Sequence, residues 1–128
     1  MDFKRLREAN SARYLENKGN CHNWLITEWT NALAGEVGEL CNIVKKTRRG
    51  WDGDPNIEDL KQDIGYELAD IIIYADIIVS KLGIDLGEAI REKFNIVSNK
   101  RGSLVFLDEE SIKNIDCPFA PEEDFLDE

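Results

Sequence analysis

The chain has 128 residues, 42% of them hydrophobic, and a net charge of −10. This length suits one domain with a sizeable core. The longest apolar run, "IIIYADIIV", contains an aspartate and is too short to cross a bilayer, so we expect no membrane span. We also expect no signal peptide, because the given sequence does not open with a basic, apolar and small-residue leader. The residues from Gly102 onward hold nine acidic side chains and one lysine, which leaves −2 for the rest of the chain and no basic surface of the kind that binds nucleic acid or anionic lipid.

Two helices are predicted in the first half of the chain. The first covers residues 3 to 17 and ends at "ENKGNCHN"; its weak stripe includes Phe3, Leu6, Ala9 and Arg13. The second runs from Trp24 or Thr27 to Arg48, where the turn residues of "RRGWDGDPN" end it. Its apolar residues recur at steps of four, four, three and four, at Trp29, Leu33, Val37, Leu40 and Val44. Steps of this size are typical of one face of a helix.

Two more helices follow. The third spans residues 57 to 82, and its apolar stripe consists of Leu60, Ile64, Leu68, Ile71, Ala75, Ile78 and Leu82. Gly83 is expected to stop it, and Asp85 to cap a fourth helix that ends near Arg101. We therefore expect an all-α fold, with a helical domain over residues 1–101 and an acidic extension over residues 102–128. Because "IIIYADIIV" is apolar nearly all round, we also expect a second chain to cover it, in a homodimer or homotetramer.

The cysteines give a prediction about the cellular compartment. Cys21, Cys41 and Cys117 are scattered and odd in number, which argues against a disulfide framework or a zinc site. Their pattern favours the reducing cytoplasm.

The stretch "ALAGEVGEL" combines two glycines with two carboxylates. Glu36 and Glu39 are three residues apart and share a helix face, and Glu36 occupies a position that the apolar row would normally fill. Gly35 and Gly38 each cost a helix about 1 kcal/mol relative to alanine. Without side chains they allow a ligand or a neighbouring helix to approach the backbone. Room for a metal site and tight helix packing both explain them.

The third helix repeats the carboxylate spacing. Glu67 and Asp70, in "ELAD", are again three residues apart, and Glu67 lies in the row of Ile64 and Ile71. Two helices joined by a short loop pack antiparallel, so the two pairs can face each other. Four carboxylates in a half-buried cleft repel one another unless a cation binds between them. Oxygen ligands favour Mg²⁺ or Mn²⁺.

Two alternatives to this metal site stand beside it. A di-iron site requires Glu-x-x-His on two helices, and His22, the single histidine of the chain, lies outside both carboxylate pairs. An isolated E-x-x-E pair is usually a solvated surface feature, and the same reading applies here if the pairs do not meet.

Several residues near the carboxylate pairs could bind other parts of a nucleotide. Lys46 leads a cationic group that either captures phosphate or interacts with the helix dipole; the group consists of Lys45, Lys46, Arg48 and Arg49. Trp24 and His22 are candidates for contact with a nucleobase, although a packed loop explains them equally well. Trp29 continues the apolar stripe and is expected in the core, and Trp51 is either a lid or a surface residue.

The segments "WTNALAGEVGELCNIVKKTRRG" and "ELADIIIYADIIVSKLGIDLGEAIREKFNIVSNKRG" resemble, in order, the two signature blocks of the MazG-like all-α nucleoside triphosphate pyrophosphohydrolases. They cover about 60 residues. The resemblance implies a four-helix bundle that cleaves (deoxy)nucleoside triphosphates between the α and β phosphates, giving the monophosphate and pyrophosphate. A non-catalytic helical module that binds a nucleotide or a protein, with a structural metal site, is the alternative.

The resemblance also implies roles for individual residues. Mg²⁺, or Mn²⁺, would be held by Glu36, Glu39, Glu67 and Asp70, with Glu39 as the catalytic base. Lys93 and Arg101 would contact the substrate phosphates, together with Asn95. Here the sequence departs from the family's Lys-x-x-x-Asn pattern, since Val97 stands four residues after Lys93.

Overall fold

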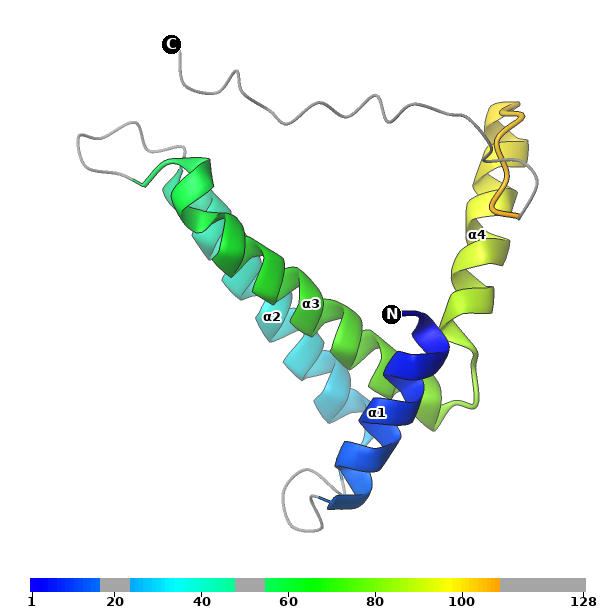
Figure 1. The fold of residues 1–128 in the computed structure, drawn as a ribbon, viewed down its shortest axis with the longest axis horizontal. Helices are drawn as coiled ribbons and strands as arrows, with labels where there is room; N and C mark the ends of the chain where they lie inside the picture. The colour runs from blue at the N-terminus through cyan, green and yellow to red at the C-terminus, as the bar shows by residue number, and fades with distance from the viewer. Residues whose placement is uncertain (17–23, 48–54, 109–128) are drawn as a thin grey trace. The chain divides into compact units, whose positions relative to one another are not determined.

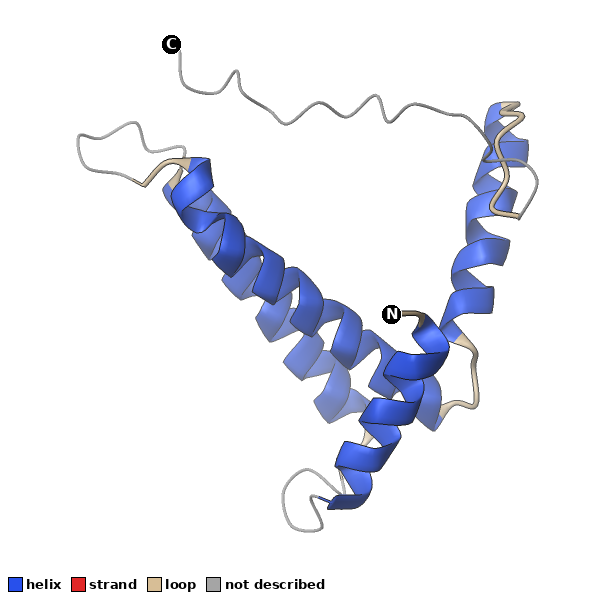
Figure 2. Cartoon of the chain, viewed as in Figure 1, coloured by secondary structure: helices blue, strands red, loops and turns tan. Residues whose placement is uncertain are grey.

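The chain forms four helices and no strand within the residues that the computed structural model describes, which are 1–16, 24–47 and 55–108 (Figure 1, Figure 2). The helices are α1 (Phe3–Glu16), α2 (Ile26–Lys46), α3 (Ile57–Lys81) and α4 (Leu86–Arg101). They confirm the all-α prediction, and their ends lie within a few residues of those expected. Over these same ranges, none of the helices has both the length and the apolarity that a membrane span requires.

Local hydrogen bonds fix where α3 begins and ends. At its start, the Asp59 backbone N–H donates to Asn56 Oδ1 at 3.0 Å, and the Asn56 N–H donates to Asp59 Oδ2 at 3.2 Å. This reciprocal pair is a capping box. At its end, Gly83 adopts a φ of 68°, and the N–H of Ile84 donates to the Val79 carbonyl at 2.9 Å. A left-handed residue of this kind terminates a helix and favours glycine, as the sequence predicted.

The chain divides into two compact units, Met1–Gly87 and Glu88–Glu128, and each is described by itself. In the first unit, α2 and α3 pack side by side along their lengths and run in opposite directions, and α1 packs on α3 (Figure 1). Most of α4 belongs to the second unit. The domain boundary that the sequence predicts after residue 101 stays a prediction.

The face of α2 that packs on α3 differs in part from the predicted stripe. Trp29 is 6% exposed and is the one fully buried apolar side chain among the described residues, which confirms its place in the core. Val37 and Val44, however, are 42% and 38% exposed. The half-buried row instead includes Leu33 and Glu36. A carboxylate therefore lies where the helix interface would otherwise be apolar.

The face of α1 that contacts α3 includes polar side chains, and the predicted stripe on this helix is wrong in part, since Ala9 and Arg13 are exposed. Asp76 of α3 is 0% exposed and accepts hydrogen bonds from Arg7 Nε at 2.9 Å and Asn10 Nδ2 at 3.0 Å. These contacts place the buried charge against a guanidinium and an amide, and they attach α1 to α3.

Candidate metal centre

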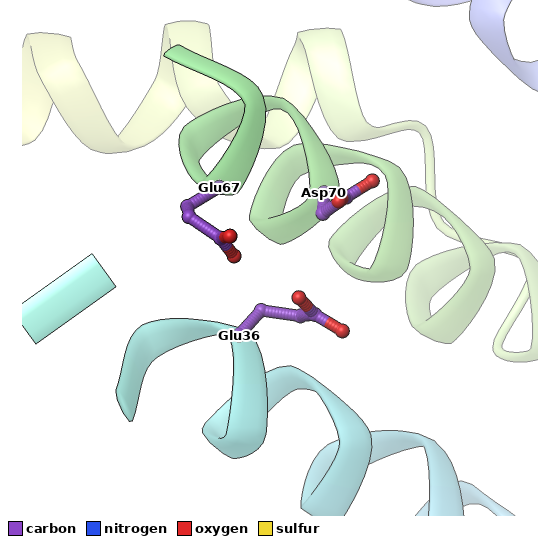
Figure 3. A group of neighbouring side chains, drawn as sticks. All are labelled: Glu36, Glu67 and Asp70. Carbon is purple, nitrogen blue, oxygen red and sulfur yellow. The ribbon is translucent and has the colours of Figure 1, made fainter. Parts of the chain in front are cut away.

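Three of the four predicted carboxylates converge between α2 and α3 (Figure 3). One oxygen from each of Glu36, Glu67 and Asp70 lies within 4.8 Å of the others. Glu36 projects from α2, and the other two from α3. Glu36 and Glu67 are half-buried, whereas Asp70 is exposed. The group therefore has a protein side, formed by the two half-buried residues, and a side that is open to solvent.

The helix pair itself brings these residues together. Glu67 and Asp70 are three residues apart on α3, so they project from neighbouring positions on one face. Glu36 occupies the half-buried row of α2, which faces α3. Because the helices run antiparallel and pack along their lengths, two separate sequence motifs meet at one point of the interface.

Negative charge accumulates at this point. Loss of hydration raises the pKa of Glu36, and the charges of Glu39, Asp70 and Glu67 raise it further, as does a hydrogen bond with the Glu67 carboxyl group. Each of these effects favours the protonated form of Glu36 when no cation is bound. A divalent cation would remove the same repulsion without protonation.

We expect Glu36→Gln to raise the melting temperature of the metal-free protein by a few degrees at neutral pH. A carboxyl group whose pKa is raised by folding stabilises the fold fully below its unfolded pKa, and that contribution is lost as the pH rises through the raised folded value. The pKa of Glu36 is raised from 4.5, so the gain from the neutral amide should be present at pH 7 and absent near pH 4. Thermal unfolding across this pH range in the presence of a chelator measures the difference. An equal shift at both pH values would contradict the explanation.

One oxygen in the group requires a partner. Glu67 Oε2 is buried and has no hydrogen-bond partner among the residues that the structure describes. Such an orphan carboxylate oxygen is unfavourable unless something binds to it. A hard divalent cation fits the donors present, because every one of them is a carboxylate oxygen. Glu36, Glu67 and Asp70 are therefore the residues that could hold Mg²⁺ or Mn²⁺.

Glu39 lies next to this group but is not part of it. Its side chain is exposed, and its oxygens are not among those that converge. Its charge is nevertheless the largest charge effect on the pKa of Glu36, so the two carboxylates lie close together. This position, beside the converging oxygens and open to water, differs from that of a fourth ligand.

The glycines of α2 are not explained by packing within the described residues. A methyl group added at Gly35 or Gly38 would meet no atom within 4 Å among them. A helix turns by about 100° per residue, so Gly35 lies on the side of Glu39, while Gly38 lies about 160° around the helix from Glu36. Of the two, Gly35 is the glycine beside Glu39.

An aromatic group lies further along the same interface. The Trp24 and Trp29 rings are 4.9 Å apart in an edge-on arrangement, and the Trp29 ring is 5.8 Å from that of Tyr74. Trp29 precedes Glu36 by seven residues and Tyr74 follows Glu67 by seven, which is about 10 Å along each helix. Since the helices are antiparallel, both displacements run in the same direction. Tyr74 was not predicted, although its spacing from Glu67 could have indicated it.

The other predicted site residues lie on other parts of the chain. Lys46 is exposed at the end of α2, about 15 Å along the helix from Glu36. Three of them belong to α4 in the second unit: Lys93, Asn95 and Arg101. His22, Arg48, Arg49 and Trp51 lie outside the described residues.

The chain matches no protein-family model, no curated protein and no solved structure.

Proposed function

We propose that the chain is a Mg²⁺-dependent nucleotide pyrophosphohydrolase of the MazG-like type, which also accepts Mn²⁺ and cleaves (deoxy)nucleoside triphosphates between the α and β phosphates. The observation that carries this proposal is the convergence of Glu36, Glu67 and Asp70 from two antiparallel helices. The unpartnered Glu67 Oε2 supports it, because that oxygen requires a cation or a donor. We further propose a cytoplasmic homodimer or homotetramer.

A nucleoside triphosphate is the substrate class that this chemistry favours. Mg²⁺ keeps several waters and is usually shared between one or two carboxylates and substrate phosphates. Asp70 is exposed, so phosphate oxygens can approach the group from solvent. When bound, the metal would neutralise the phosphate charge and activate the attacking water. Trp24 is the described candidate for contact with the base.

In this proposal Glu39 receives the proton of the attacking water. A general base must lie near the reacting water without being fully engaged elsewhere. Glu39 is exposed and lies close to Glu36, outside the three converging oxygens. Lys93, Arg101, Asn95 and Lys46 remain the proposed phosphate contacts on the resemblance alone.

Pyrophosphate release from a panel of nucleoside triphosphates with Mg²⁺ tests the function. We expect release from at least one of them, and loss of release after adding a chelator. Glu39→Gln should retain metal binding and lose turnover. If the whole panel is inert while the protein still binds Mg²⁺, the non-catalytic module with a structural metal site becomes the better explanation.

The two glycines of α2 offer a paired test of the substrate's path. Gly35→Ala and Gly38→Ala should each stabilise the helix by up to about 1 kcal/mol, since neither methyl group meets an atom among the described residues. Only Gly35→Ala should raise KM, because that methyl group projects on the side of Glu39. Urea unfolding and steady-state kinetics measure the two effects. Equal KM values for the two variants would show that the substrate does not pass over Gly35.

A further inference from the structure

A shallow apolar groove lies on α4 in the second unit. It encloses about 450 Å³, and its lining is almost entirely apolar; the residues are Ala89, Ile90, Lys93, Phe94 and Val97. Ile90 and Phe94 are 37% and 43% exposed. Apolar side chains exposed together along a helix mark a surface that binds something.

The charged residues beside this groove indicate what kind of segment would bind to it. Ile90, Phe94 and Val97 recur at helical spacing, and Arg101 continues the row four residues later. Lys93 lies within the lining, which contains no acidic residue. If the same groove of a second copy packed on it about a two-fold axis, Lys93 would face its own counterpart. The groove therefore favours an acidic occupant that carries apolar side chains.

The chain itself runs back along α4, on the face opposite this groove. After α4 ends, the N–H of Ser103 donates to the Ser98 carbonyl at 3.0 Å, and the N–H of Leu107 donates to Asn95 Oδ1 at 2.7 Å (orange segment, Figure 1). The pKa of Arg91 is raised chiefly by its hydrogen bond with Glu88, and Asp108 also contributes. Residues 103–108 thus run back along α4, and the described chain ends beside its first half.

The sequence that follows has the required chemistry. Residues 109–128 contain eight acidic side chains and one lysine, and their apolar residues include Ile112, Ile115 and Phe119. An extended chain advances about 3.3 Å per residue, so about six residues suffice to pass halfway around a helix some 10–12 Å wide. We propose that the α4 groove is the docking site of the chain's own segment 109–128. Apolar side chains of the segment contact Phe94 and its neighbours, and carboxylates pair with Lys93 and Arg101.

This docking would give the acidic segment an effect on catalysis, and that part rests on the proposed function. Lys93 and Arg101 are the residues proposed to contact substrate phosphates. Carboxylates bound to them would compete with the triphosphate, so weakening the docking should lower KM. The docking itself is measured without any activity.

Cys117 provides a natural position for a probe within the segment. In the full chain carrying Cys21→Ser and Cys41→Ser, a nitroxide on Cys117 should broaden the amide NMR signals of Ile90 and Phe94 more than that of Ile96. Around α4, Ile96 lies about 120° from Ile90 and about 160° from Phe94. Phe94→Ser should abolish this difference, whereas Ile96→Ser, the matched control on an exposed residue, should preserve it.

A mixed sample separates docking within one chain from docking between chains. Isotope-labelled protein without nitroxide is combined with unlabelled protein that carries it. Broadening in this mixture as strong as in the singly labelled chain would mean that the segment binds a second copy, and the proposal would be overturned. Uniform or absent broadening in the original chain, or broadening that Phe94→Ser leaves unchanged, would overturn it as well.

Discussion

Glu67→Gln is expected to lower both Mg²⁺ affinity and hydrolysis by more than about 100-fold. Even residues that only support a metal ligand typically cost 10–100-fold when replaced, and Glu67 is proposed as a direct ligand. Its Oε2 is buried without a partner among the described residues, so the substitution removes charge where nothing else can replace it. Calorimetric titration with Mg²⁺ and Mn²⁺ measures affinity, and pyrophosphate release measures turnover.

Asp63→Asn is the matched control for this experiment. Asp63 is an exposed carboxylate one turn earlier on α3, outside the converging group. Its replacement removes the same charge from the same helix, so both measurements should remain within about two-fold of the unmodified protein, as expected for a screened surface charge. If Glu67→Gln binds metal as tightly as Asp63→Asn does, the three carboxylates are a surface cluster and the proposed chemistry is wrong.

Glu39→Gln distinguishes a fourth ligand from a base. The sequence motif assigns Glu39 to the metal, but the structure leaves its oxygens outside the group of three. We therefore expect its metal affinity to fall much less than that of Glu67→Gln, while turnover falls by about 100-fold or more, within the usual range for a general base. Equal losses of affinity in the two variants would return Glu39 to the ligand set.

Much of the helical fold could be predicted from local signals. Turn residues and apolar spacing gave the four helices, and Gly83 adopts the left-handed conformation expected of a helix stop. The spacing was less reliable for the exact face. Val37 was assigned to the interface and is 42% exposed, while Glu36 is half-buried. Neighbouring residues lie about 100° apart around a helix. Apolar stripes that begin one residue apart therefore face different directions, and contacts with α3 decide which of them is buried.

The contacts of α1 could not be predicted because they depend on pairs distant in sequence. Asp76 interrupts an apolar run, and from the sequence alone it indicated a break in that run. In the structure it is fully buried, since Arg7 and Asn10, more than 60 residues away, bind its two oxygens. For the carboxylate site the opposite holds. Regular i, i+3 spacing on two adjacent helices predicted that four carboxylates meet, and three of them do, Glu36, Glu67 and Asp70, while Glu39 lies outside the group.

The attachment of α1 leads to the second large expected effect: Asp76→Ala should destabilise the protein by about 3 kcal/mol. Breaking a buried ion pair typically costs 3–5 kcal/mol, and the lower end applies because the Arg7 side chain is 28% exposed while that of Asp76 is 1% exposed. The substitution also leaves Asn10 Nδ2 without its carboxylate partner. Since whole domains are stable by only 5–15 kcal/mol, urea unfolding should show a much lower midpoint.

Two further variants show whether the charge pair or the lost volume is responsible. The exposed pair of Lys61 and Glu58 has the same charges at 3.4 Å, so Glu58→Ala should cost less than about 1 kcal/mol. Arg7→Met combined with Asp76→Leu replaces the pair by apolar side chains and should recover most of the stability lost in Asp76→Ala. Should Asp76→Ala cost no more than Glu58→Ala, the buried contact would not hold α1 to α3. If the double variant is as unstable as Asp76→Ala, the fold requires these specific hydrogen bonds, including the one from Arg7 Nη2 to the Ile84 carbonyl, and not merely a filled interface.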